Sequence, residues 1–538
     1  MNVADGIARI LKDEGVEYLI CYPRQLLIDA CTKAGIRPIV CRQERVGMGI
    51  ADGISRSTNG KRIGVFAMQG GPGIENSFAG VAQAYADNSP VLVLPAGPLG
   101  RSYTSPHFHA VEHFRGITKW AASLDAPDRL SELMRRAFQN LRTGKPGPVL
   151  IEIPDNVILA EIGDSPAYAP ARPLRSAPDP ADVRSVAELL LQSACPVIHA
   201  GQGVMYAGAT AALVELAELI QAPVLTTNIG KSAFPENHPL SLGASVISAP
   251  KAVFHFLKKA DLVIGIGASL TINPWTPKIP PGKKVIQIGN DPADINKEVP
   301  CVAAMLGDAK LALEALIAEI GARKRPDYGI AAEVRSIKEA WLAEWAPELA
   351  SSEVPINQYR ILNDLMHAVN PAEVIITHDA GSPREQFVTF WECHAPRSYL
   401  GWGKSTQLGH GLGLIIGAKL AHPDKLCINV MGDASIGMVG MDIETAVRHE
   451  IGILTLVMNN GAMANEKLSM PFATERHRAI DLGGNYSGVA RELGAWSARV
   501  ETPDAFLPEL QKAIEATRSG RPALLECMVK HNFRYSRY

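Results

Sequence analysis

Several features that would narrow the function are absent from this sequence or scarce in it. The eight cysteines are scattered and form no C-x-x-C pair, so we expect reduced thiols in apolar segments and no paired-cysteine metal motif. The net charge is −2 and no basic run is interleaved with aromatic residues, so nucleic acid is not an expected partner. No apolar run is long enough to cross a membrane, and the N-terminal segment lacks the shape of a signal peptide. We therefore expect a cytoplasmic protein without membrane contact.

The chain has 538 residues, of which 47% are apolar, which is too many residues for one core and points to several domains. Short apolar runs alternate with helical patterns throughout, which is typical of βαβ units and parallel sheets. Two breaker-rich stretches, 164–182 and 315–329, interrupt this alternation. The pattern predicts an α/β protein of three doubly wound parallel-sheet domains at 1–165, 181–325 and 355–538, the central one Rossmann-like.

Asp433 follows an apolar run, Ile428–Met431, that predicts a buried strand. A buried carboxylate costs free energy unless a cation or hydrogen-bond donors compensate its charge. The next predicted strand ends at Asn460, and a right-handed crossover places the ends of consecutive parallel strands at one edge of the sheet. Oxygens of Asp433 and Asn460 that meet there suit Mg²⁺, which keeps positions for phosphate and water. The alternative is that Asp433 caps the next helix and Asn460 belongs to an ordinary turn.

The G-D motif that contains Asp433, followed one strand later by the N-N pair that contains Asn460, resembles the diphosphate and magnesium motif of thiamine-diphosphate-dependent enzymes. The usual final glycine of that motif is replaced by Ala434, a small residue that still permits close backbone approach. The resemblance implies side-chain metal ligands at Asp433 and Asn460 and a backbone carbonyl ligand at Ala462. Contacts with the cofactor are implied for Gly432, Ala434, Ser435 and Met463.

Glu44 and the tripeptide Ala51–Gly53 match the family's pattern of a glutamate, six residues and then Ala-Asp-Gly. The resemblance implies that Glu44 binds N1′ of the aminopyrimidine ring in a dry site, where its pKa rises. The ring is thereby driven to the imino tautomer that takes the proton from the thiazolium C2. Without that context, Glu44 would be a first-turn carboxylate stabilised by the helix dipole.

Two further segments resemble parts of the family's cofactor site. The loop Q-G-G-P-G is similar to its G-P-G loop, with Gly71 and Asn76 in matching positions. In S-T-Q-L-G-H-G-L-G, the resemblance implies that the Thr406 carbonyl meets the 4′-amino group of the cofactor and that Leu408 wedges the cofactor into a bent form. A plain core position remains the alternative for Leu408.

The candidates for proton transfer are Glu466 and three histidines. Glu466 stands six residues after Asn460, as a catalytic glutamate does in the pyruvate-type decarboxylases that this segment resembles. Those enzymes also use histidines in the first domain, and here His107, His109 and His113 are available, with surface histidines as the alternative. Near the first strand, Arg24 stands beside Gln25, and Arg24 would either bind a substrate carboxylate or lie on the surface.

The whole chain resembles the acetolactate synthase-like group, in which a 2-oxo acid is decarboxylated and the acyl or aldehyde unit is transferred to a second carbonyl. Simple 2-oxo acid decarboxylation, cleavage of a 2-hydroxyacyl-CoA and a non-catalytic nucleotide-binding role remain alternatives. The segment Ser269–Gly282 replaces the acidic-basic stretch of the flavin-binding synthases, which argues against FAD and leaves a nucleotide or no ligand for the central domain. The resemblance further implies a homodimer or a dimer of dimers with active sites between chains.

Overall fold

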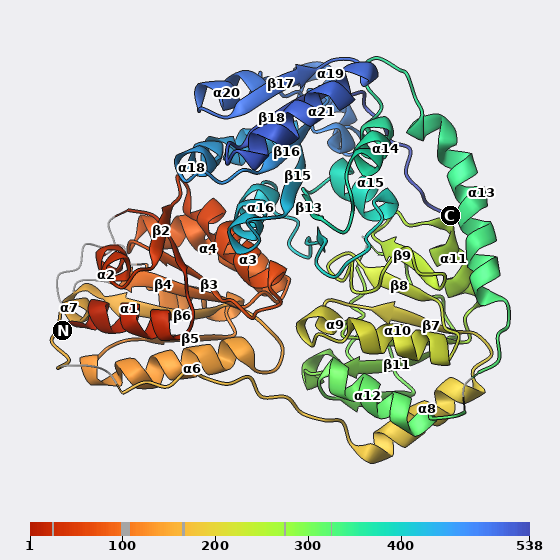
Figure 1. Cartoon of the computed structure of the whole chain (residues 1–538), viewed down its shortest axis with the longest axis horizontal. Helices are drawn as coiled ribbons and strands as arrows, with labels where there is room; N and C mark the ends of the chain where they lie inside the picture. The colour runs from red at the N-terminus through yellow and green to blue at the C-terminus, as the bar shows by residue number, and fades with distance from the viewer. Residues whose placement is uncertain (24–25, 98–107, 164–166, 274–275, 324) are drawn as a thin grey trace.

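The three-dimensional structure is a computed structural model, and it describes the whole chain except residues 24–25, 98–107, 164–166, 274–275 and 324. Three six-stranded sheets follow one another along the chain, and the neighbouring strands described in each are parallel. This confirms the predicted α/β class (Figure 1). Among the described residues, no helix is both long and apolar enough to span a membrane.

The first sheet has the strand order β2-β1-β3-β4-β6-β5. Its strands are β1 (Tyr18–Cys21), β2 (Arg37–Val40), β3 (Gly64–Met68), β4 (Val91–Gly97), β5 (Trp120–Ser123) and β6 (Val149–Pro154). The accompanying helices are α1 (Val3–Asp13), α2 (Leu27–Lys33), α3 (Glu44–Ser57), α4 (Pro72–Ala86), α5 (Ala110–His113), η1 (Arg115–Ile117), η2 (Pro127–Arg129), α6 (Leu130–Arg142) and α7 (Asp155–Ile158). Central strands such as β4 are buried along their whole length, as expected where helices cover both faces of a parallel sheet.

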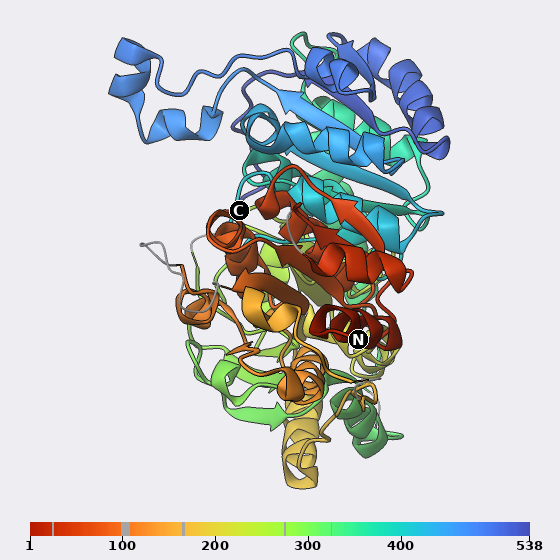
Figure 2. The ribbon, with the colours of Figure 1, turned by 90° about the vertical axis from the view of Figure 1, so that its left-hand side faces the viewer.

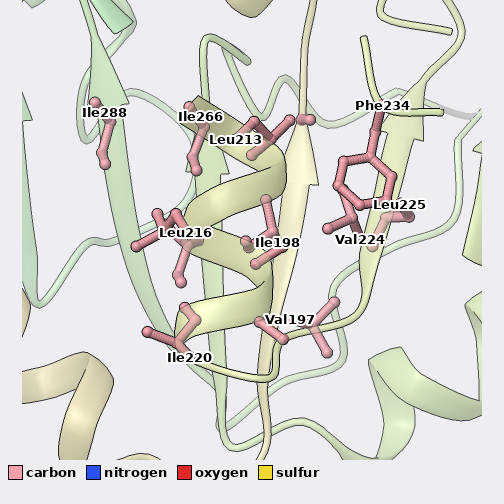
Figure 3. Close-up of a cluster of buried hydrophobic side chains, with 14 of the residues drawn as sticks. Val197, Ile198, Leu213, Leu216, Ile220, Val224, Leu225, Phe234, Ile266 and Ile288 are labelled. Carbon is pink, nitrogen blue, oxygen red and sulfur yellow. The ribbon is translucent and has the colours of Figure 1, made fainter. Parts of the chain in front are cut away.

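The second sheet has the order β12-β11-β10-β7-β8-β9. Its strands are β7 (Pro196–Ala200), β8 (Val224–Thr227), β9 (Ser241–Ser245), β10 (Leu262–Ile266), β11 (Lys284–Gly289) and β12 (Ala303–Leu306). Its helices are α8 (Pro180–Gln192), α9 (Gly203–Tyr206), α10 (Thr210–Leu219), α11 (Lys251–Lys259), η3 (Pro292–Asp294) and α12 (Ala309–Ile320). Figure 3 shows Leu213 and Leu216 of α10 packed against Ile198 of β7 in a core that is separate from those of the other two sheets.

The third sheet has the order β14-β13-β15-β16-β18-β17. Its strands are β13 (Val374–His378), β14 (Tyr399–Leu400), β15 (Leu426–Gly432), β16 (Leu454–Asn459), β17 (Trp496–Val500) and β18 (Ala523–Met528). The helices are α13 (Ile330–Leu349), α14 (Gln358–Ala368), α15 (Ser382–Phe390), α16 (His410–Ala421), α17 (Asp433–Val439), η4 (Gly440–Asp442), α18 (Ile443–Arg448), η5 (Ala464–Leu468), α19 (Pro471–His477), α20 (Tyr486–Glu492) and α21 (Pro503–Arg518). All three sheets fall inside the predicted domain intervals, whose boundaries stay a prediction.

Helices α3 and α16 join the first sheet to the third (Figure 1). Glycines lie at their contact, since a Cβ atom on Gly53 would overlap the Leu414 carbonyl oxygen and one on Gly417 would overlap a carbonyl oxygen of α3. Gly49 precedes Gly53 by one turn and Gly413 precedes Gly417 by one turn, so each helix presents a glycine face to the other. The two backbones therefore approach closely enough to exclude side chains between them.

One hydrophobic core serves both of these sheets. It contains buried side chains of the first sheet, such as Ile20 and Phe66, and of the third sheet, such as Met431 and Leu524. The first and third domains, although far apart in the sequence, are therefore packed as one unit around the elements that carry the predicted site.

Candidate active site

The strand ends predicted to form a metal site lie together in the structure. Asp433 is the first residue of α17, directly after β15, and Asn460 directly follows the neighbouring strand β16. The backbone N–H of Ala462 donates to Asp433 Oδ2 at 3.0 Å and to Asn460 Oδ1 at 3.1 Å. Because both oxygens lie within hydrogen-bonding distance of one N–H, they converge on a single point at the edge of the sheet. Gly432, not Asp433, occupies the N-cap position of α17.

Asp433 is a buried carboxylate whose hydrogen-bond donors are backbone amides. Besides the bond from Ala462, its Oδ1 accepts the N–H of Ala434 at 2.9 Å, and burial raises the pKa of the Asp433 carboxyl. Among the described residues, no Lys or Arg side chain forms an ion pair with it, and no cluster of three or more His, Cys, Asp or Glu side chains is placed to hold a metal. A cation at Asp433 would therefore be held by a few protein oxygens and would leave positions for other oxygen ligands, as Mg²⁺ requires.

A second buried aspartate, Asp379, supports this turn and was not singled out from the sequence. It directly follows β13, and its carboxylate accepts the N–H groups of Gly409 at 3.0 Å and Gly411 at 3.1 Å. Ser435 Oγ donates to the same carboxylate at 2.7 Å, so the predicted diphosphate-binding Ser435 is already engaged with a neighbour. An apolar run ending in an aspartate is the signal that identified Asp433, and it could have identified Asp379 as well.

The segment before α16 carries backbone strain. Thr406 has φ of 54°, in the left-handed region that β-branched residues rarely adopt, and such strain clusters at ligand sites. Two residues later, the carbonyl of Leu408 accepts a hydrogen bond from the Arg45 guanidinium of the first domain. Leu408 and Thr406 thus lie where the third domain meets the start of α3.

Glu44 is the first residue of α3 and is buried. Its Oε2 accepts a hydrogen bond from the Asn76 amide at 3.3 Å, and burial raises the pKa of its carboxyl. Gly71, the N-cap of α4, has φ of 65°. Gly73 in the first turn of α4 lies close to Glu44, since a Cβ atom there would be 3.5 Å from Glu44 Oε1. The predicted partners Glu44 and Asn76 are thus in contact, and Gly71 begins the helix that carries Asn76.

Glu466, His109 and His113 are the predicted proton-transfer residues that the structure describes. Glu466 is half-buried in η5, and His109 directly precedes α5. Between these two described residues the structure shows no hydrogen bond. His113 stacks on Phe108 with ring centroids 4.1 Å apart. The predicted positions His107, Arg24 and Gln25 lie outside the described residues. Glu152 was not expected from the sequence: burial raises the pKa of its carboxyl, which accepts the Ala110 N–H at 3.0 Å beside His109 and His113.

A cavity of about 1460 Å³ lies at the carboxyl ends of strands in the second sheet, the edge at which α/β sheets bind ligands. Its charged lining side chains are mostly basic and include Lys404 of the third domain. Lys145 of the first domain forms ion pairs at this cavity with Asp291 at 3.3 Å and with Asp294 at 2.7 Å. The sequence-based preference for a nucleotide or no ligand over FAD stays a prediction.

Three family models match the chain in an order that agrees with the three sheets. They are described as the N-terminal TPP binding domain, the central domain and the C-terminal TPP binding domain of thiamine pyrophosphate enzymes, and they match residues 1–113, 183–316 and 379–527. The chain belongs to the thiamine pyrophosphate enzyme family. Thiamine pyrophosphate is a synonym of thiamine diphosphate, so the predicted family is confirmed and its two TPP-binding domains support thiamine diphosphate as the cofactor.

Relatives of this thiamine pyrophosphate enzyme share nearly its whole length. It is 30% identical to a probable acetolactate synthase large subunit of Methanocaldococcus jannaschii, over 98% of this chain and 92% of the relative. It is 29% identical to a sulfoacetaldehyde acetyltransferase of Alcaligenes xylosoxydans xylosoxydans (98% and 91%), and 30% identical to a probable 2-ketoarginine decarboxylase of Pseudomonas aeruginosa (86% and 83%). These relatives confirm the prediction of an acetolactate synthase-like, thiamine-diphosphate-dependent enzyme.

Proposed function

We propose that the enzyme decarboxylates a 2-oxo acid and transfers the acyl or aldehyde unit to a second carbonyl, with thiamine diphosphate and Mg²⁺ bound by the residues described above. The observation that carries the proposal is the convergence of Asp433 and Asn460 on the N–H of Ala462. Relatives named as a synthase and as an acetyltransferase support transfer to an acceptor. The bound cofactor would supply a nucleophilic carbon and an electron sink for this chemistry.

The chemistry of the donor set fits this assignment. Asp433 and Asn460 offer oxygen atoms, and Ala462 adds a backbone carbonyl, which are ligands that Mg²⁺ prefers. Asp433 carries a negative charge that no described basic side chain neutralises. In this proposal the cation compensates that charge, while the backbone around Gly432, Ala434, Ser435 and Met463 lies against the diphosphate.

Glu44 would act at the other end of the cofactor. Its carboxyl is buried, has a raised pKa and is hydrogen-bonded through one oxygen to Asn76, so the other oxygen can bind a ring nitrogen. A carboxyl in such a dry site holds a proton more readily than an exposed glutamate, which suits proton exchange with an aminopyrimidine ring. Thr406 and Leu408 would lie against the cofactor where the third domain meets the start of α3.

We further propose that two copies of this chain form the working unit. Exposed apolar side chains support it: Phe78 and Tyr85 lie on one face of α4, and Met438 and Met441 lie on and just after α17, close to the proposed diphosphate turn. Large exposed apolar side chains near a functional site are typical of surfaces covered by another subunit.

A second candidate is simple 2-oxo acid decarboxylation, with Glu466 as the proton donor. The similarity to a probable 2-ketoarginine decarboxylase favours it. One experiment separates the two reactions: the purified enzyme is supplied with thiamine diphosphate, Mg²⁺ and a panel of 2-oxo acids, alone and in pairs. The proposed function predicts CO₂ release together with a coupled product whenever an acceptor carbonyl is present.

Release of free aldehyde equal to the CO₂, even with acceptors present, would replace the transfer reaction by the second candidate. Under that outcome, Glu466→Gln should slow aldehyde release. No CO₂ from any 2-oxo acid in the panel would reject both candidates, and calorimetric titration with thiamine diphosphate and Mg²⁺ would then show whether cofactor binding itself had failed.

A further inference from the structure

The C-terminal tail, residues 529–538, runs past the proposed metal loop after β18. His531 Nε2 lies 2.9 Å from the carbonyl oxygen of Asn460. Further on, Ser536 Oγ donates to the Ala249 carbonyl at 2.7 Å, which fixes the end of the tail to the second domain. Tyr535 lies between these two anchors, so its position is set from both sides.

Tyr535 takes part in a closed ring of three hydrogen bonds. Its hydroxyl donates to Asn465 Oδ1 at 3.0 Å and lies 2.8 Å from Ser382 Oγ, and Asn465 Nδ2 donates to Ser382 Oγ at 3.5 Å. Since the tyrosine proton is directed to Asn465, the Ser382 hydroxyl donates to Tyr535 and every donor in the ring has an acceptor. Burial raises the pKa of Tyr535, so its hydroxyl keeps the proton that the ring needs.

The three members of this ring come from three segments that leave the proposed cofactor site. Ser382 stands three residues after Asp379, which holds Ser435 and the start of α16. Asn465 stands three residues after Ala462 and directly before Glu466. The ring therefore ties the chain that leaves one cofactor turn to the chain that leaves the other.

The segment that contains Asn465 is bridged to itself at its base, where Ala462 pairs with Asp481, and is exposed beyond it. We name residues 463–482 the arm; in Figure 2 it extends to the upper left, away from the third sheet. Leu468 is 80% exposed and Phe472 is 70% exposed, so this part of the arm is not packed on the body of the chain. Within the described residues, Asn465 is the only member of the arm whose side chain hydrogen-bonds to the rest of the protein. The ring thus adds a side-chain anchor at the start of the arm to the backbone hydrogen bonds at its base.

We infer that Tyr535 is a positioning residue: through Asn465 and Ser382 it holds the start of the arm, and with it Glu466, in a fixed place beside the cofactor. The inference rests on the proposed function for the role of Glu466, although the ring itself does not depend on that function. Tyr535→Phe keeps the aromatic ring and removes only the hydroxyl, which leaves Asn465 and Ser382 joined by the 3.5 Å bond alone.

The test compares Tyr535→Phe with Tyr538→Phe, a matched loss of a hydroxyl in the same tail. Tyr538 Oη donates to Glu344 at 2.9 Å on α13, away from the ring. We expect amide hydrogen exchange over residues 464–468 to become about fivefold faster in Tyr535→Phe, the factor that corresponds to one net hydrogen bond, and to stay unchanged in Tyr538→Phe. We also expect kcat to fall in Tyr535→Phe while thiamine diphosphate affinity is kept.

Two further outcomes decide the inference. Equal exchange over 464–468 in Tyr535→Phe and the unmodified protein would overturn it, whether or not the enzyme turns over any 2-oxo acid. A rise in KM without any change in exchange would overturn it too, because Tyr535 would then contact substrate directly. If the ring acts as a unit, Ser382→Ala combined with Tyr535→Phe should raise exchange no further than either change alone.

Discussion

Glu44 is the residue whose chemistry can be tested most directly. Replacing it with glutamine keeps the shape and the hydrogen bond to Asn76 but removes the ability to gain or lose a proton. Loss of a positioned acid–base group lowers turnover by about 10²- to 10⁴-fold, and we expect Glu44→Gln to fall in that range. The measurement is the rate of CO₂ release with saturating cofactor.

Glu75→Gln is the matched control, because Glu75 also lies in the first turn of a helix but is exposed. It should leave the rate unchanged. Near-normal turnover in Glu44→Gln would contradict the role assigned to Glu44.

Asp442 predicts a pH dependence of stability. Its carboxylate is buried and accepts the backbone N–H of Arg42 and the Thr445 hydroxyl, each at 2.8 Å. The charged side chains of Arg42, Glu444 and Arg448 lie near it. Burial raises its pKa to about 6, above the unfolded value. The folded state therefore binds the proton more tightly, and this contribution to stability is present at low pH and lost as the pH rises through 6.

Relative to Asp442→Asn, the unmodified protein should lose on the order of 3 kcal/mol of unfolding free energy between about pH 4 and pH 6. Urea denaturation of both proteins across this range measures the difference. A difference that stays constant with pH would show that Asp442 does not titrate in this way.

At the scale of elements, the contact between α3 and α16 requires glycine where the two helices touch. A methyl group on Gly53 would overlap the Leu414 carbonyl oxygen, which cannot move without shifting its helix. We expect Gly53→Ala to destabilise the protein by about 3 kcal/mol, at the upper end of overpacking costs, as measured by chemical denaturation. Gly116→Ala, where a Cβ atom meets nothing within 4 Å, should cost little, and an equal cost at both positions would contradict the argument.

At the scale of the whole molecule, we expect light scattering to give two or four times the mass of one chain, for a homodimer or a dimer of dimers. Met441 is 51% exposed and would lie in the subunit contact, so Met441→Glu should shift the mass to that of a single chain and lower activity. Leu174→Glu, at an exposed position of the linker, should change neither. A single-chain mass for the unmodified protein, with full activity, would contradict the proposed pairing.

The sequence predicted the candidate site best where the functional residues stand at the ends of recognisable strands. Asp433 and Asn460 could be placed together because each ends an apolar run and the crossover rule fixes the geometry of consecutive parallel strands. The contacts of Tyr535 with Asn465 and Ser382 could not be predicted, because they join segments far apart in the chain that share no periodicity. The contact of α3 with α16 could be predicted only in part. Its glycines recur at helical spacing, but that spacing does not indicate which helices pair.

The core shared by the first and third sheets has a consequence for how the protein is made. Translation delivers the first-sheet members of this core, such as Ile20 and Phe66, long before its third-sheet members, such as Met431 and Leu524. A nascent chain that has formed its first sheet therefore exposes part of this apolar surface to water while the rest of the chain is still being synthesised. We therefore expect the chain to need chaperones during synthesis. Fragments that end before α16 should aggregate, because the first and third domains bury this core together.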